Sequence, residues 1–248
     1  MKRINDISYG SSSANKYDVF LPDGKVNAVF VYIHGGGIVE GDKTLGDITA
    51  TYLANHGIAT VTPNYRMYPE ADYPDFIFDC AKVVALINDY MRQELNCDKL
   101  FVGGSSAGGY LSMMLCFDES YLKSVGIDNT QIAGYYHDAG QPTAHFNVLK
   151  YRGIDPRRII VDETAPLYHI KADMNYPPMH FVVSDNDMQN RYEQTQLVLS
   201  TLRHFGYSDF GYTLMHGGHC EYCEKVDENG NNIFAQMILD FITKVIER

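Results

Sequence analysis

Gly104-Ser105-Ser106-Ala107-Gly108 is the stretch that decides the fold of this chain. The apolar run from Leu100 to Val102 predicts a buried strand before it, and residues 107–117 predict a buried helix after it. A strand that turns sharply into a helix leaves no room for side chains two residues before and after the bend, which explains the two glycines. The G-x-S-x-G pattern therefore predicts an exposed Ser106 hydroxyl at the positive end of a helix dipole. A phosphate-binding loop is excluded, because no Gly-Lys-Ser/Thr follows.

A second glycine-rich stretch lies upstream, at His34-Gly35-Gly36-Gly37. It follows directly on Asn27 to Ile33, a nearly continuous apolar run that is typical of a strand covered on both faces. Three glycines in a row let the backbone approach a ligand and turn its N–H groups outward. Such groups can stabilise a developing negative charge, so the sequence favours an oxyanion loop over a plain flexible loop.

Strands and helices alternate along the rest of the chain, which predicts the α/β class with a doubly wound, mostly parallel sheet. The expected strands are 16–21, 58–62, 131–136, 179–183 and 210–215, and the expected helices are 44–56, 74–95, 190–205 and 232–246. We expect residues 1–248 to form a single domain. Residues 137–162 interrupt the alternation and predict a lid or insertion. The aromatic residues of this segment either line a pocket or form a small satellite core.

The composition excludes some classes of partner. The net charge is 20 − 31 = −11, which argues against binding to nucleic acid or to an anionic membrane surface. The N-terminal residues lack the apolar core of a signal peptide, and the five cysteines are scattered along the chain. We therefore expect reduced thiols, a cytoplasmic location and a small-molecule substrate. The sequence is compatible with a homo-oligomer.

A serine hydroxyl becomes a good nucleophile only with a base in reach and an acid that orients the base. Asp185 and Asp187 follow one late strand, and His216 and His219 follow the last one. Loops at the carboxyl ends of parallel strands converge, so one acid and one histidine can meet Ser106. Asp187 and His219 are favoured because they lie further into their loops.

The histidines allow two other assignments. His34 precedes the nucleophile, and we assign it a structural role in the glycine loop. The stretch His216-x-x-His219-Cys220-x-x-Cys223 carries donors that zinc accepts. Its spacing is more compressed than that of paired zinc knuckles. We therefore predict no metal and no cofactor.

Together these motifs resemble α/β-hydrolase esterases of the hormone-sensitive-lipase-like group and the short bacterial acetyl or carboxyl esterases. The resemblance implies an α/β-hydrolase fold with about eight strands, helices on both faces of the sheet and a small lid insertion. It rests on His34-Gly35-Gly36-Gly37, Asn64-Tyr65-Arg66, Pro69-Glu70, Pro74, Asp79 and Gly104-Ser105-Ser106-Ala107-Gly108-Gly109.

The resemblance also implies roles for residues. The acid ends a glycine-x-x-Asp turn, which matches Asp187 with Ser184 in place of the glycine, and the base matches His219. The oxyanion hole matches the backbone amides of Gly36, Gly37 and Ala107. Ser105 departs from the pattern, because the family often carries an acidic residue at this position.

We therefore expect a serine hydrolase that cleaves carboxylic esters of small soluble substrates through an acyl-enzyme. Short acyl esters, among them acetylated sugars or aryl esters, fit the absence of a large cap. The alternative is an amide or formamide hydrolase, or a peptidase, of the same fold, because the sequence does not identify the leaving group. A non-catalytic small-molecule receptor is a third reading, although such proteins usually lose one of the three catalytic residues.

Overall fold

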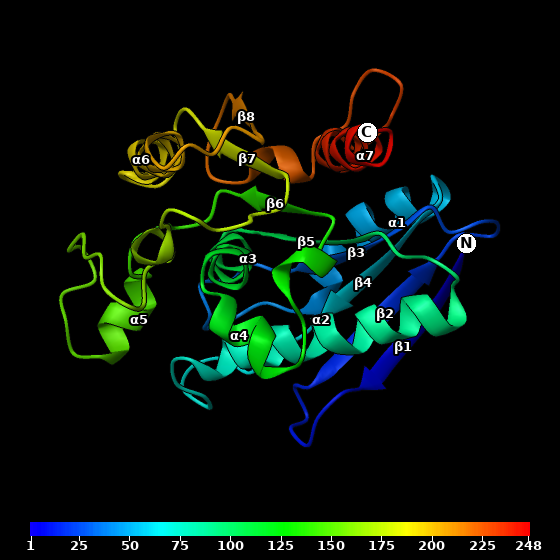
Figure 1. Ribbon diagram of the computed structural model, residues 1–248, viewed down its shortest axis with the longest axis horizontal. Coiled ribbons are helices and arrows are strands. Elements are labelled where there is room, and N and C mark those ends of the chain that lie inside the picture. The colour runs from blue at the N-terminus through cyan, green and yellow to red at the C-terminus, as the bar shows by residue number, and fades with distance from the viewer.

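A sheet of eight strands forms the centre of the molecule in the computed structural model, which describes residues 1–248 (Figure 1). The strand order is β1-β2-β4-β3-β5-β6-β7-β8. Strand β2 runs antiparallel to both of its neighbours, and the strands from β4 to β8 are parallel. The strands are β1 (Lys2–Ser8), β2 (Lys16–Leu21), β3 (Ala28–Ile33), β4 (Ile58–Pro63), β5 (Leu100–Ser105), β6 (Gly134–Asp138), β7 (Met179–Ser184) and β8 (Phe210–Met215).

Helices cover both faces of the sheet, as the fold class predicts (Figure 1). Helices α1 and α7 pack on one face, and α2, α3 and α6 pack on the other. None of the helices combines the length and the apolar run that crossing a membrane requires. The helices are α1 (Asp47–Asn55), α2 (Asp75–Glu94), α3 (Ala107–Phe117), α4 (Glu119–Ser124), α5 (Phe146–Tyr151), α6 (Arg191–His204) and α7 (Ile233–Ile246), with short 3-10 turns η1 (Lys43–Gly46), η2 (Asn129–Gln131), η3 (Pro166–His169) and η4 (Glu221–Cys223).

The burial of strand β3 on both faces explains why its sequence is one continuous apolar run. Val29, Val31 and Ile33 belong to the core under α2 and α3, whereas Phe30 and Tyr32 belong to the core under α7. All six residues of the strand are buried. A strand with a helix layer on each face has no polar face, which is the pattern that the sequence shows.

The structure corrects several expected boundaries. The strand expected at 131–136 is β6 at Gly134–Asp138, so the first two residues of the expected 137–162 insertion belong to the sheet. The helix expected at 44–56 divides into η1 and α1. Strand β1 was not predicted, because it is an edge strand without a fully buried residue and therefore carries no apolar run.

The carboxyl ends of β5, β6, β7 and β8 lie together at one edge of the sheet. Ser105 is aligned with Asp138 across β5 and β6, and Ser184 is aligned with Met215 across β7 and β8. The loops that follow these four strands therefore begin side by side. Residues 106, 139–145, 185–190 and 216–220 all enter this region, which is where the sequence places its candidate residues.

Candidate active site

Ser106 occupies the bend between β5 and α3 in a conformation that non-glycine residues rarely adopt, with φ of 56° and ψ of −115°. The two glycines around it have no space for a side chain. A Cβ at Gly104 would lie 2.3 Å from the carbonyl oxygen of Ile33, and one at Gly108 would lie 1.9 Å from the same atom. The predicted lack of space at both glycines is confirmed, but the nearest obstacle is β3 and not the bend itself.

The structure brings His219 and Asp187 to this serine. Nε2 of His219 lies 2.8 Å from Oγ of Ser106, and Nδ1 of His219 lies 2.6 Å from Oδ1 of Asp187. The Asp187 side chain is fully buried, and that of His219 is 24% exposed. Two hydrogen bonds thus connect three residues that come from three different loops.

The alternative acid and histidine form a separate pair. Nδ1 of His216 lies 2.6 Å from Oδ2 of Asp185, and the two side chains are 87% and 42% exposed. Asp185 also accepts a hydrogen bond of 3.1 Å from the backbone amide of Gly217. This pair does not contact Ser106, and it braces the loop that carries His219.

Ser184, which stands where the family pattern has glycine, joins the acid turn to the histidine loop. Its hydroxyl donates a hydrogen bond of 2.9 Å to the carbonyl oxygen of Gly218. The backbone amide of Asn186 donates to the carbonyl oxygen of Gly217 over 3.3 Å. The departure from the family pattern therefore adds a contact next to His219.

Hydrogen bonding sets the charge states of this pair. Burial would raise the pKa of Asp187, but the hydrogen bond from His219 and the amide of Met188 hold that pKa below its ordinary value. Burial would lower the pKa of His219, but its bonds with Asp187 and Cys220 raise the pKa to about 10. Asp187 therefore stabilises the positive charge that His219 acquires when it takes a proton.

The glycine loop presents free backbone donors. Gly36 and Gly37 have φ of 105° and 63°, and their amide groups donate to no acceptor in the protein. Ala107 is the first residue of α3, so its amide has no partner within the helix. The side chain of Asn147 donates a hydrogen bond of 2.7 Å to the carbonyl oxygen of Gly37 and holds the loop. Asn147 lies 110 residues away in sequence, and no local pattern identifies it.

His34 is structural, as its position before the nucleophile predicts. It is fully buried and stacks on Tyr65 with 4.5 Å between ring centroids, and burial lowers its pKa to about 4. The Tyr65 hydroxyl donates a hydrogen bond of 3.0 Å to the His34 carbonyl oxygen. Arg66 pairs with Asp79 of α2 through bonds of 2.8 and 2.9 Å, which fixes the loop after β4.

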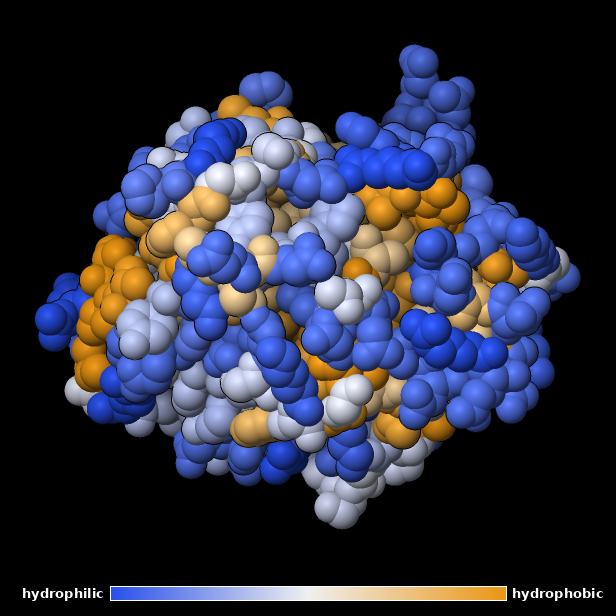
Figure 2. Space-filling model, viewed as in Figure 1, coloured by the Kyte–Doolittle hydropathy of each residue, from blue (hydrophilic) through white to orange (hydrophobic).

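A cavity of about 450 Å³ is lined by residues between Gln141 and Ile159 and by residues at the start of α6. Met188, next to Asp187, and Phe146, which lies against Gly37, both line it. The nearby surface is apolar. Ile159 and Val161 are 53% and 46% exposed, and Figure 2 shows hydrophobic atoms gathered over the α5 side of the molecule. Other residues of this segment form a small satellite cluster of Ala144, Leu149 and Ala165.

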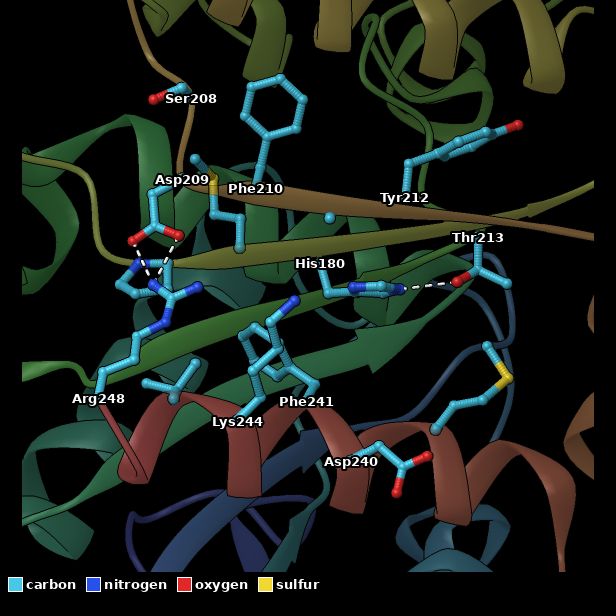
Figure 3. A pocket seen from close by; sticks show the side chains of 15 residues that line it. His180, Ser208, Asp209, Phe210, Tyr212, Thr213, Asp240, Phe241, Lys244 and Arg248 are labelled. Carbon is cyan, nitrogen blue, oxygen red and sulfur yellow. Dashed lines mark hydrogen bonds and ion pairs between the residues drawn. The ribbon is translucent and has the colours of Figure 1, made fainter.

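A second cavity, of about 550 Å³, lies between the start of β8 and the end of α7 (Figure 3). Four of its polar side chains form two pairs. Arg248 lies 2.6 Å from Asp209, and Nε2 of His180 lies 2.9 Å from the Thr213 hydroxyl. None of Ser106, Asp187 and His219 lines this cavity.

Comparison with known proteins places these features in a family. The BD-FAE family model matches residues 17–150, which is more than half of the chain. A probable isoprenylcysteine alpha-carbonyl methylesterase of Arabidopsis thaliana is 27% identical over 142 residues, covering 54% of this chain and 33% of that protein. An acetyl esterase of Salmonella schwarzengrund is 28% identical over 107 residues, covering 42% of this chain and 32% of that protein. The chain thus aligns with about a third of the length of these relatives.

Solved structures confirm the predicted α/β-hydrolase fold. Esterase B from Lactobacillus rhamnosis has a TM-score of 0.81 at 18% identity, covering 99% of this chain and 86% of that chain. A truncated carbohydrate esterase from gut microbiota has a TM-score of 0.79 at 15% identity, covering all of this chain and 97% of that chain. The predicted resemblance to α/β-hydrolase esterases is therefore confirmed.

Proposed function

The chain belongs to the BD-FAE family, and from that premise we propose that it is a serine hydrolase that cleaves carboxylic esters through an acyl-enzyme. One observation carries the proposal. The hydrogen bonds of 2.8 Å from Ser106 to His219 and of 2.6 Å from His219 to Asp187 form the arrangement that activates a serine. The names of the aligned relatives, a methylesterase and an acetyl esterase, are consistent with this chemistry.

In the proposed mechanism, Oγ of Ser106 attacks the ester carbonyl carbon while Nε2 of His219 takes the hydroxyl proton. Asp187 keeps Nδ1 of His219 protonated and stabilises the imidazolium that forms. His219 then gives the proton to the leaving alcohol, and the C–O bond of the ester breaks. Water enters and His219 removes its proton, so the same sequence releases the acid and restores Ser106.

The backbone amides of Gly36, Gly37 and Ala107 are the proposed oxyanion donors. They are fixed before substrate arrives, because Asn147 holds the loop and the helix holds Ala107. Donors placed in advance stabilise the tetrahedral intermediate without reorganisation, and each is typically worth about 3 kcal/mol of barrier. The strained backbone of Ser106 points its hydroxyl toward the same space.

The cavity of about 450 Å³ supports a small substrate. Its lining combines apolar side chains, Phe146, Ile159 and Met188, with the polar groups of Gln141 and Arg191. A pocket of this kind holds an apolar group and orients it with a few polar contacts. We therefore propose short acyl esters with a small or aryl alcohol part, among them acetylated sugars.

The experiment is a panel of p-nitrophenyl esters from acetate to octanoate, measured on the wild-type chain, Ser106→Ala and Ser105→Ala. Ser105 is the matched control, because it lies in the same turn but hydrogen-bonds to Tyr32 over 2.9 Å. We expect Ser106→Ala to lose turnover of every ester and Ser105→Ala to retain most of it, with acetate the best substrate. Equal turnover by wild type and Ser106→Ala would refute the proposal. A preference for N-formyl aromatic amides over esters would replace it by amide hydrolysis.

A further inference from the structure

Two cysteines that the proposed mechanism does not use converge on a buried carboxylate beside His219. Asp138 ends β6, and Cys220 and Cys223 lie on the turn η4. Oδ2 of Asp138 lies 3.8 Å from Sγ of Cys220 and 3.6 Å from Sγ of Cys223. The three potential ligand atoms all lie within 4.8 Å of one another.

These separations match the edges of a tetrahedral zinc site. Zinc binds sulfur at about 2.3 Å and oxygen or nitrogen at about 2.0 Å, so tetrahedral angles place neighbouring ligand atoms about 3.5 to 3.8 Å apart. The two distances from Asp138 to sulfur fall in this range. Nε2 of His219 lies 3.7 Å from Sγ of Cys220, but it lies outside the group of three ligand atoms that are within 4.8 Å of one another. The protein thus offers three ligands and leaves the fourth position to water.

The contacts of Asp138 leave one of its carboxylate oxygens, Oδ2, available to bind a cation. The residue is fully buried, and no lysine or arginine forms an ion pair with it. The hydroxyl of Tyr222 donates to Oδ1, so Oδ2 is directed at the two sulfurs. The buried guanidinium of Arg191 donates instead to the carbonyl oxygen of Ala139. A carboxylate oriented by a hydroxyl in this way is a common arrangement around a metal ligand.

We propose that Asp138, Cys220 and Cys223 bind a thiophilic divalent cation such as Zn²⁺, with water in the fourth position. Binding exchanges the two thiol protons for the metal and releases them to solvent. Cys220 follows His219 directly, and its Sγ lies 3.7 Å from Nε2, the atom that receives the proton of Ser106. Binding of Cys220 to a cation constrains the loop that carries His219, so we expect the cation to inhibit hydrolysis, an effect that rests on the proposed function.

This donor set differs from the one that the sequence suggests. The compressed His216-x-x-His219-Cys220-x-x-Cys223 stretch contains no carboxylate, and it includes His216, whose side chain is 87% exposed and paired with Asp185. The structure replaces both histidines by Asp138, which lies 82 residues before Cys220. The pairing of β6 with β7 and of β7 with β8 places the end of β6 near the histidine loop that follows β8.

Cobalt(II) tests the site without reference to catalysis. The full chain, kept reduced with a phosphine reductant, is titrated with Co²⁺ and followed by absorption. We expect a thiolate-to-cobalt charge-transfer band that saturates at one equivalent and that Zn²⁺ removes. Cys220→Ser and Cys223→Ser should weaken or abolish the band, and Cys97→Ser, a buried thiol on the loop after α2, should retain it. A chain without the band, or a band that both serine variants keep, would overturn the proposal.

Inhibition by Zn²⁺ tests the coupling between the cation site and the loop that carries His219. With p-nitrophenyl acetate as substrate, we expect Zn²⁺ to inhibit wild type and Cys97→Ser reversibly, with activity restored by EDTA. Cys223 makes no contact with His219, and Cys223→Ser should need at least about tenfold more Zn²⁺ for the same inhibition. Equal inhibition of wild type and Cys223→Ser would refute the coupling. A chain with no esterase activity would refute the proposed function, while the cobalt band would still report on the metal site.

Discussion

Replacing Asp187 by asparagine tests which of two neighbouring carboxylates supports the base. Both Asp185 and Asp187 lie 2.6 Å from a histidine, so distance alone does not separate them. The Asp187 side chain is fully buried and its histidine contacts Ser106, whereas Asp185 and its histidine are exposed and contact no nucleophile. Asp187→Asn should therefore impair catalysis, and Asp185→Asn should not.

The expected magnitude follows from these environments. An asparagine at 187 keeps the size of the side chain but removes the charge and no longer selects the protonated Nδ1 of His219. This change lowers kcat by about 10⁴-fold in a serine–histidine–carboxylate arrangement, which is about 5 kcal/mol of barrier. An exposed ion pair such as Asp185–His216 is worth about 0–1 kcal/mol, so Asp185→Asn should change kcat at most about fivefold.

Steady-state hydrolysis of p-nitrophenyl acetate by the wild type and both variants measures the effect. We expect the loss at 187 in kcat, with KM little changed, because Asp187 does not line the cavity next to the site. Thermal denaturation and circular dichroism serve as the control for folding. Similar kcat values for Asp187→Asn and Asp185→Asn, both in folded protein, would contradict the assignment of the acid.

Three further predictions follow from the same geometry. Asn147→Ala removes the side chain that holds the oxyanion loop. It should lower kcat about tenfold or more with KM nearly constant, because displaced donors weaken binding of the transition state. An unchanged kcat would contradict this role of Asn147. Gly108→Ala puts a Cβ 1.9 Å from a backbone oxygen and should prevent stable folding or strongly lower Tm. The control Gly24→Ala, whose Cβ would have no atom within 4 Å, should leave Tm unchanged. Calorimetry measures Tm for both variants. His219 must be neutral to accept a proton, and its pKa is raised above 6.5. The pH profile of kcat/KM should therefore rise with pH, with an apparent pKa above 6.5. An apparent pKa at or below 6.5 would refute the shift.

Much of the fold was predictable because its signals are local. The apolar run of β3, the helical period of α2 and the glycines around Ser106 each lie within a few residues, and each describes the burial of its own segment. Edge strand β1 gave no such signal, since none of its residues is fully buried. The boundaries of β6 shifted for a related reason, because the polar His137 and Asp138 are buried strand residues.

The candidate site was predictable in its chemistry but not in its contacts. The order of serine, carboxylate and histidine in the chain restricts the acid and the base to two residues each, because loops at one edge of a parallel sheet converge. Which acid and which histidine contact Ser106 depends on the burial and orientation of their side chains. Only the packing of the loops decides these. The structure separates Asp187–His219 from the exposed Asp185–His216 pair.

The sequence by itself therefore determined the class of fold, the bend that exposes Ser106 and the glycine loop beside it. Each of these is encoded in a pattern only a few residues long. Only the tertiary structure decided that Asn147 holds the Gly37 carbonyl and that Asp138 faces Cys220 and Cys223. Those contacts join residues about 80 to 110 positions apart, and no local pattern can encode a distance that the pairing of strands and the docking of a loop create.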